Sequence, residues 1–350
     1  MDDSAIIRKF LCDTMAGRPD IETFTAPNGV IALDKFPRIH PDLVILDVEM
    51  PGLGGLETLE RLLKFDPHLR VIMFSSLTES GAKVSMEALA LGATDCLAKP
   101  TSNGSAIVGM DFLKQELLPR VLGLLGLADK GMESLSSPLA SASHPPGQIF
   151  SKNKSIPGKF DILAIASSTG GPNALSALFE ALSGTLPVPI VGVQHMPPMF
   201  TKLLVERLST KYEGSVHEGK SGECLLPGHF YLAPGDFHMQ LVKEGENIVT
   251  ALHQGPPENS CRPAADVLFR SVVKLFGNRA LFLVLTGMGQ DGLLGCKELK
   301  KVGGYLLAQD EASSVVWGMP GAVTRAGLVD EVLPLSGIAF RIQQLLTRRK

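Results

Sequence analysis

The sequence predicts an α/β protein of two domains, each built on a parallel sheet with helices on both faces. The chain has 350 residues, which is enough for two ordinary domains. Short apolar runs alternate with helical patterns over residues 1–125 and again over 160–347, and such alternation is typical of doubly wound sheets. Residues 126–159 are rich in Ser, Pro and Gly and lack hydrophobic periodicity, which indicates a linker.

In the first domain, an amphipathic helix is expected over residues 4–15 and a closing helix over 112–127. The expected strands are short and apolar: 43–46, 71–74 and 96–98. In the second domain they are 162–166, 190–194 and 281–285, with helices between them. This order places every strand parallel to its neighbours, because a helix returns the chain after each one.

The composition and charge of the chain argue against several classes of protein. Hydrophobic residues make up 45% of the chain and charged residues 20%, which is typical of a globular protein. A net charge of −3 argues against a nucleic-acid-binding protein. No apolar run is long enough to span a membrane and no signal peptide opens the chain. The five cysteines form no C-x-x-C pair, which favours reduced thiols. We therefore expect a cytoplasmic protein that is not membrane-inserted.

Polar residues follow the strands of the first domain. Asp2 and Asp3 precede its first helix, and Asp47, Ser75 and Lys99 follow its successive strands. Because the carboxyl ends of parallel strands meet at one edge of a sheet, these residues should converge. Clustered carboxylates with a single lysine suit Mg²⁺, which takes oxygen ligands. The interpretation is a metal site at Asp2, Asp3 and Asp47, with Asp47 as the phosphate acceptor and Ser75 and Lys99 contacting the phosphoryl oxygens.

This half of the chain resembles the receiver domains of two-component response regulators, a flavodoxin-like α/β fold. The resemblance is carried by Asp2-Asp3-Ser4, by LDVEMPG at 46–52, by Ser75-Ser76 and by Lys99-Pro100. It implies phosphorylation of Asp47 by a histidine kinase. The family places a hydrophobic strand before the acidic pair, whereas only Met1 precedes Asp2 here. The receiver therefore apparently lacks its first strand, and we hypothesise that the true start lies upstream.

The second domain carries the residue types of a serine hydrolase at its strand ends. Ser168 follows the strand at 162–166, within the turn SSTGGP, and His195 follows the strand at 190–194. Asp291 comes shortly after a third strand. A serine hydroxyl needs an adjacent base, and imidazole titrates near neutrality. Ser168, His195 and Asp291 are therefore the candidate nucleophile, base and orienting group.

Two segments of this domain fit other interpretations. The turn after Ser168 suits a helix N-cap that binds an anion. It lacks both the G-x-G-x-x-G spacing of dinucleotide-binding turns and the G-x-S-x-G elbow of common α/β-hydrolases. The stretch GSVHEGKS at 214–221 matches the P-loop expression. A helical pattern at 200–212 precedes it and no helix follows, so its context is wrong for a nucleotide site.

Residues 160–335 resemble the methylesterase domain of chemotaxis response regulators, the CheB family. The segments that carry this resemblance are IASSTGGP at 165–172, QHMP at 194–197, YLAPG at 231–235, Arg262-Pro263, LTGMG at 285–289 and AQDEASS at 308–314. It implies Ser168, His195 and Asp291 as the catalytic residues. It also implies that the backbone N–H groups of Thr169 and Met288 form the oxyanion hole, where donors stabilise the developing charge.

The two resemblances together imply one function. The chain is expected to hydrolyse glutamate methyl esters on methyl-accepting chemoreceptors under control of receiver phosphorylation, and the same residues could deamidate selected glutamines. A chemotaxis histidine kinase would be the phosphodonor. Mg²⁺ would belong to the receiver domain only, with no cofactor for the ester chemistry. The alternative is a non-catalytic receptor-binding module regulated by phosphorylation, in which the three candidate catalytic groups would not meet.

Overall fold

The computed structural model describes residues 1–99, 113–127 and 158–347. The chain divides into two compact units, residues 1–138 and 139–350. Most of the linker expected at 126–159 lies outside the described residues. In the first unit the helices and strands are α1 (Ala5–Met15), α2 (Gly29–Ile39), β1 (Leu43–Asp47), α3 (Gly55–Phe65), β2 (Arg70–Ser75), α4 (Glu79–Leu91), β3 (Asp95–Ala98), η1 (Leu113–Leu117) and α6 (Leu118–Leu125).

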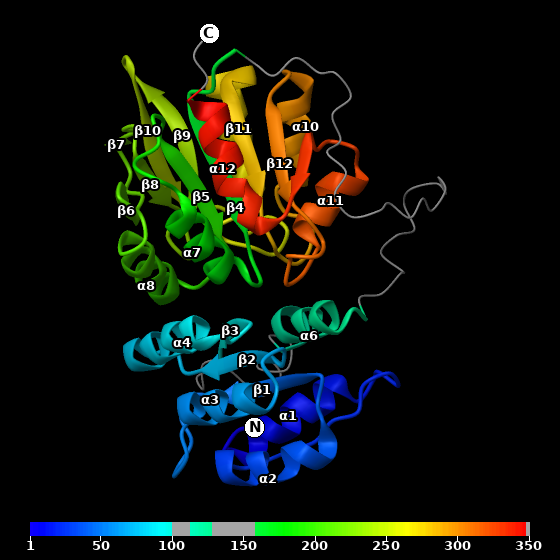
Figure 1. Ribbon diagram of the computed structural model, residues 1–350. Coiled ribbons are helices and arrows are strands. Elements are labelled where there is room, and N and C mark those ends of the chain that lie inside the picture. Colours follow the sequence, from blue (N-terminus) through cyan, green and yellow to red (C-terminus); the bar gives the residue numbers. More distant parts are fainter. Residues whose placement is uncertain (100–112, 128–157, 348–350) are drawn as a thin grey trace. The chain divides into compact units, whose positions relative to one another are not determined.

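The first unit is a layered α/β structure. Within the described residues its sheet has the order β1-β2-β3, with parallel pairing throughout. Helices α2, α3 and α4 contact one another in sequence, and α6 packs against β1 (Figure 1). The expected closing helix begins instead as a π-helical turn, η1, and α6 ends at Gly126. Gly126 has φ +69°, a left-handed conformation that terminates helices.

Met1 continues the sheet beyond β1. Its ammonium group donates to Ile45 O at 2.7 Å, and Asp47 N donates to Met1 O at 2.9 Å. These two bonds are the pattern of a parallel ladder between Met1 and Leu46. On the other side, Asp2 N donates to Ala26 O at 3.3 Å. Met1 and Asp2 thus occupy the position of a strand end between β1 and Ala26.

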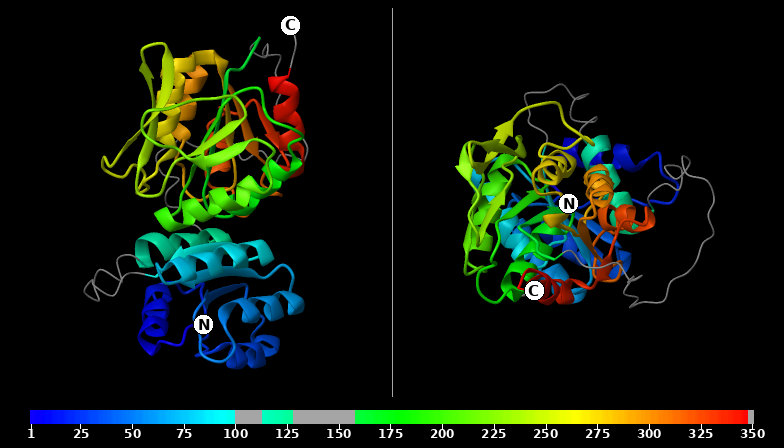
Figure 2. Two further views of the ribbon diagram at one scale, coloured as in Figure 1. Left: turned by 90° about the vertical axis from the view of Figure 1, so that its left-hand side faces the viewer. Right: turned by 90° about the horizontal axis from the view of Figure 1, so that it is seen from above.

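The second unit has a larger sheet. Its elements are β4 (Ile162–Ser167), α7 (Gly171–Ala181), β5 (Ile190–Gln194), α8 (Pro198–Ser209), β6 (Ser215–Glu218), β7 (Glu223–Cys224), β8 (His229–Leu232), β9 (His238–Glu244), β10 (Asn247–His253), α9 (Ala265–Phe276), η3 (Gly277–Arg279), β11 (Ala280–Val284), α10 (Leu293–Lys301), β12 (Tyr305–Gln309), α11 (Met319–Arg325), β13 (Glu331–Leu333) and α12 (Leu335–Leu346). Within the described residues, the parallel sheet has the order β13-β12-β11-β4-β5-β8-β6. Strands β9 and β10 pair antiparallel with each other (Figure 2).

Helices cover both faces of this sheet, as the alternating pattern predicts. Helices α7 and α12 contact each other, and Figure 1 shows α12 lying across the strands. Helices α9 and α10 pack together, and α9 contacts β4, β5 and β11. The Phe269 ring on α9 stacks on Phe282 of β11, with ring centroids 4.1 Å apart. Every residue of β4, β5, β11 and β12 is buried, which is expected for a parallel sheet covered on both faces.

The P-loop-like stretch at 214–221 is part of this sheet. Residues Ser215–Glu218 form β6, which pairs with β8, and the next element along the chain is β7 rather than a helix. The stretch is therefore not a loop between a strand and a helix, in agreement with the sequence interpretation. Among the helices that the structure describes, none has the length and apolar character needed to cross a membrane.

Candidate active site

Ser168 lies directly after β4, at the turn into α7. Gly170 caps α7 with φ +77°, which a residue without Cβ adopts without strain. At Gly171, a Cβ atom would lie 1.9 Å from Gln194 Oε1. The two glycines therefore allow the chain to turn sharply against the end of β5. Pro172 follows within the first helical turn, where the missing N–H carries no penalty.

The two adjacent serines have different environments. The Ser167 hydroxyl donates to Gln194 Oε1 at 2.7 Å and is fully buried. Gln194 Nε2 in turn donates to the carbonyl oxygen of Ser168 at 2.9 Å. Ser167 therefore holds the strand ends together. Among the described residues, the Ser168 hydroxyl has no hydrogen-bond partner, so it is the serine available to a substrate.

The strand register brings Ser168 and His195 side by side. Ser167 pairs with Gln194 in the β4–β5 ladder, and His195 N donates to Ser167 O at 3.2 Å. Ser168 and His195 are therefore the next residues on two neighbouring strands, which lie about 4.8 Å apart. In the described residues no hydrogen bond joins their side chains. The sheet register alone brings the two residues close together.

His195 and Asp291 form a buried pair. Nε2 of the imidazole lies 2.8 Å from Asp291 Oδ2, and both side chains are almost fully buried. Burial by itself would raise the pKa of Asp291, but His195 and backbone N–H groups outweigh it and the pKa is lowered. The carboxylate is thus kept ionised, as a group that orients and stabilises an imidazolium must be.

The start of α9 and a neighbouring turn supply the donors to Asp291. Ala265 N donates to Oδ2 at 2.5 Å, and Asp266 N donates to Oδ1 at 3.1 Å. Gly292 N and Asn259 Nδ2 donate to Oδ1, each at 2.9 Å. Several N–H bonds to one carboxylate favour its charged form. Asn259 was not singled out from the sequence, although it lies three residues before Arg262-Pro263.

A second residue missed by sequence reasoning contacts His195. Cys261 Sγ lies 3.6 Å from Nδ1 of His195. Both ring nitrogens therefore have neighbours, Asp291 on one side and a thiol on the other. A lone cysteine far along the chain from the histidine gave no sequence signal for this contact.

The groups expected to form the oxyanion hole lie next to Ser168. Among the described residues, neither the N–H of Thr169 nor that of Met288 donates to a backbone or side-chain acceptor. Met288 lies between Gly287 and Gly289, which has φ +80°. At Gly287 a Cβ atom would lie 2.8 Å from Ser168 Cβ. The glycine-rich loop after β11, which contains Met288, therefore passes close to Ser168, and Thr169 is the residue after Ser168 in the β4–α7 turn.

The first unit gathers carboxylates at the carboxyl edge of its sheet. Asp2, Asp3 and Asp47 each offer an oxygen, and these atoms all lie within 4.8 Å of one another. Lys99 Nζ lies 2.9 Å from Asp2 Oδ2 and 2.7 Å from Asp47 Oδ2. Burial raises the pKa of Asp47, although Lys99 opposes the shift. Three carboxylates and one lysine leave an excess of negative charge, which fits a divalent cation with oxygen ligands.

Ser75, which is expected to contact the phosphoryl oxygens, lies at the same edge. Its hydroxyl is fully buried and accepts a hydrogen bond from Ser85 Oγ on α4 at 2.9 Å. In the described residues no hydrogen bond joins Ser75 to Asp47. The backbone links it to the site, because Lys99 N donates to Ser75 O at 2.6 Å.

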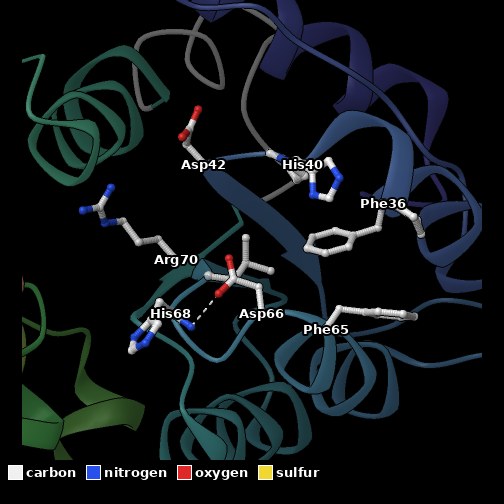
Figure 3. A pocket seen from close by; sticks show the side chains of 10 residues that line it. Phe36, His40, Asp42, Phe65, Asp66, His68 and Arg70 are labelled. Carbon is white, nitrogen blue, oxygen red and sulfur yellow. Dashed lines mark hydrogen bonds between the residues drawn. The ribbon is translucent and has the colours of Figure 1, made fainter.

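A separate pocket of about 500 Å³ opens at the opposite edge of this sheet. Figure 3 shows the rings of Phe36 and Phe65 in it, with Asp66, His68 and Arg70 nearby. Asp66 Oδ1 accepts the backbone N–H of His68 at 2.8 Å, which is a local turn contact. Ligands of open α/β sheets bind at the carboxyl edge, so we assign this pocket no role in the chemistry.

Fold and side chains together define the class of protein. An α/β unit with Ser, His and Asp at the carboxyl edge of a parallel sheet is the arrangement of a serine-type hydrolase. The other unit, with its acidic cluster and lysine, is a response regulator receiver. Residues 163–342 match the CheB methylesterase family model, and residues 1–108 match the response regulator receiver domain. The chain belongs to the CheB methylesterase family.

Relatives of known name cover the whole chain. A protein-glutamate methylesterase/protein-glutamine glutaminase of Trichodesmium erythraeum is 45% identical over 98% of this chain and 96% of its own length. A protein of the same name from a Nocardioides species is 42% identical over 100% of this chain and 95% of its own length. The CheB methylesterase catalytic domain of Thermotoga maritima matches 53% of this chain and 99% of its own, at 39% identity and a TM-score of 0.52.

Proposed function

We propose that the chain is a protein-glutamate methylesterase in which Ser168 is the nucleophile, His195 the base and Asp291 the orienting carboxylate. The observation that carries the proposal is the β4–β5 register, which places Ser168 beside a histidine already paired with a buried carboxylate. The relatives named as protein-glutamate methylesterases support the substrate class. The environment of Ser167, whose hydroxyl is bonded to Gln194, supports Ser168 as the attacking residue.

The reaction proceeds in two halves. Ser168 Oγ attacks the ester carbonyl carbon and transfers its proton to His195. The tetrahedral oxyanion is stabilised by the N–H groups of Thr169 and Met288, each worth about 3 kcal/mol. Collapse breaks the bond to the methoxy oxygen, which takes the proton from His195 and leaves as methanol. Water, deprotonated by His195, then attacks the acyl-enzyme and releases the glutamate and Ser168.

The same residues suit hydrolysis of a glutamine side-chain amide. The attack and the oxyanion are identical, and the leaving group is ammonia instead of methanol. The relatives carry the glutaminase activity in their names. We propose that the substrates are glutamate methyl esters and selected glutamines of methyl-accepting chemoreceptors.

The receiver unit supplies the control in this proposal. Asp47 is the phosphate acceptor and a chemotaxis histidine kinase is the donor. Asp2, Asp3 and Asp47 would hold Mg²⁺, which supplies positive charge beside the phosphoryl group. Lys99, within 2.7 Å of the Asp47 carboxylate, would contact a phosphoryl oxygen. The ester chemistry itself uses the chain's own Ser168, His195 and Asp291.

Methanol release from methylated receptor membranes tests the proposal. The wild-type chain should release methanol, and Ser168→Ala should lower the rate by at least about 10³-fold. Ser209→Ala is the matched control, since it removes an exposed hydroxyl that bonds only within α8 and should keep the rate. Equal loss in both variants would count against Ser168. No release by a folded wild-type chain would favour the non-catalytic receptor-binding module.

A further inference from the structure

A tight turn over residues 258–261 carries two of the contacts to the catalytic pair. Asn259 and Ser260, at its centre, both have left-handed backbone conformations, with φ 51° and 62°. Glu258 and Cys261 exchange two backbone hydrogen bonds, at 3.1 and 2.8 Å. Arg270 on α9 holds the Glu258 carboxylate at 2.7 and 2.9 Å. Non-glycine residues retain such conformations where their surroundings hold them, which is common at active sites.

The turn reaches both members of the pair. Asn259 Nδ2 donates to Asp291 Oδ1 at 2.9 Å, and Cys261 Sγ lies 3.6 Å from His195 Nδ1. His195 thus has an acceptor at Nε2 and a sulfur at Nδ1. A ring that donates from both nitrogens is the protonated imidazolium. The contacts fit this charged ring, and they also fit a neutral ring that accepts the thiol proton at Nδ1.

The charged and titratable groups around His195 favour the charged ring. Asp291 faces the ring from the start of α10, and Cys261 faces it from the turn. Asp266 on α9 donates its backbone N–H to Asp291, and burial, together with the Asp291 charge, raises the pKa of its own carboxyl. Burial by itself would lower the pKa of His195, but Cys261 and Asp291 together outweigh burial and raise it.

We propose that Cys261 is a positioning residue for His195: its sulfur holds the Nδ1 edge of the ring in the resting site and stabilises the protonated imidazole. The inference rests on the proposed function, because it assigns the thiol a role through the base of that reaction. To accept the proton of Ser168, the ring must be neutral and offer Nδ1, since Nε2 faces Asp291. Ser168 Oγ must then replace Cys261 Sγ as the group next to His195 Nδ1.

The pH dependence has a definite sign. The base is available only when the ring has lost its second proton, so activity rises with pH through the His195 midpoint. Cys261 favours the protonated ring and moves that midpoint upward. Removing the sulfur should therefore extend activity to lower pH. A variant that keeps a hydrogen-bonding group at position 261 should have a midpoint between those of the wild type and the variant without it.

Histidine NMR of the full-length protein tests this without an activity assay. The His195 signals, identified by their loss in His195→Gln, should titrate about one pH unit lower in Cys261→Ala than in the wild type. Cys261→Ser should give an intermediate midpoint and serves where the alanine variant does not fold. Cys224→Ala removes an exposed thiol of the same unit and should leave the midpoint unchanged. Equal midpoints in the wild type and both Cys261 variants would overturn the inference.

Methanol release separates this inference from the proposed function. The pH–rate profile of Cys261→Ala should shift in the same direction as the NMR midpoint, with little change in the KM for receptor. If Ser168→Ala abolishes release and the Cys261 variants keep the wild-type profile, the inference fails alone. If Ser168→Ala retains full activity, the proposed function fails, whatever the NMR midpoint of His195.

Discussion

Single residues decide the chemistry through their hydrogen bonds. Asp291 is buried, yet its carboxylate is kept charged because backbone N–H groups at the starts of α9 and α10 and the Asn259 amide donate to it. The carboxylate in turn fixes which nitrogen of His195 carries a proton. A neutral group of the same shape, such as an asparagine amide, cannot both accept these hydrogen bonds and fix the proton of the imidazole.

Asp291→Asn should therefore leave the fold intact and lower methanol release by about 10³- to 10⁴-fold, the scale seen for this change in serine proteases. The amide would present an N–H to the ring or to the donors around it, and would lose the attraction for an imidazolium. Steady-state methanol release on receptor membranes measures the effect. Asp310→Asn, a matched change at an aspartate of the β12–α11 loop, should keep the wild-type rate; a loss of less than tenfold in Asp291→Asn would contradict the assigned role.

At the scale of elements, the β4–α7 turn requires a residue without a side chain at position 171. A Cβ at Gly171 would lie 1.9 Å from Gln194 Oε1 and 2.9 Å from Ser167 Cβ. Gln194 joins the ends of β4 and β5 through Ser167 and Ser168. The turn can thus bring the serine to the sheet edge only while position 171 is glycine.

Gly171→Ala should destabilise the second unit by about 1–3 kcal/mol, the usual cost of overpacking, and should lower activity. Unfolding monitored by Trp317, the chain's one tryptophan, reports on this unit. Gly337→Ala on α12 is the control: its Cβ would meet Pro334 at 3.7 Å, and alanine in a helix is favourable by up to about 1 kcal/mol. Equal stability in the two variants would refute the packing argument.

A second prediction at the scale of elements concerns the edge of β1. Beside it lies a groove of about 380 Å³ lined by apolar residues that include Leu11, Phe36, Val44 and Val121. Met1 makes ladder bonds at one end of β1, and burial lowers the pKa of its α-ammonium to about 6. The groove is therefore suited to a parallel strand that continues backward from Met1.

Adding Val-Leu-Ile-Val before Met1 should stabilise the receiver unit by about 3 kcal/mol or more, since each buried side chain contributes about 1.5–3 kcal/mol. It would also replace a buried ammonium with a peptide N–H. Hydrogen exchange at the β1 amides, followed by mass spectrometry on the full chain, should show slower exchange. A Gly-Ser extension of equal length should have no such effect, and equal protection by the two extensions would contradict the prediction.

At the scale of the whole molecule, the chain joins a receiver unit to a hydrolase unit. Each site lies at the carboxyl edge of its own parallel sheet, but the two sites differ in the balance of their charges. The receiver gathers negative charge around Asp47, whereas the hydrolase balances one carboxylate against one imidazole. Under the proposed function, control of the hydrolase by the receiver depends on the charge state of Asp47.

Asp47→Ala should keep basal methanol release and abolish its stimulation by a small acyl phosphate donor with Mg²⁺. The variant lacks the acceptor oxygen but leaves Ser168, His195 and Asp291 unchanged. Asp42→Ala, an exposed carboxylate before β1, is the matched control and should keep full stimulation. Stimulation retained in Asp47→Ala would show that the phosphate acceptor lies elsewhere.

The sequence by itself predicted the two α/β units, most strand positions, and Ser168, His195 and Asp291 as candidate residues at one sheet edge. These follow from local patterns, because apolar runs, glycine turns and parallel strand ends are encoded within a few residues of one another. Only the tertiary structure decided which serine is free, what donates to Asp291, and that Cys261 lies on the second nitrogen of His195. Those contacts join residues far apart in the chain, such as Cys261 and His195, and depend on a left-handed turn that no local pattern specified.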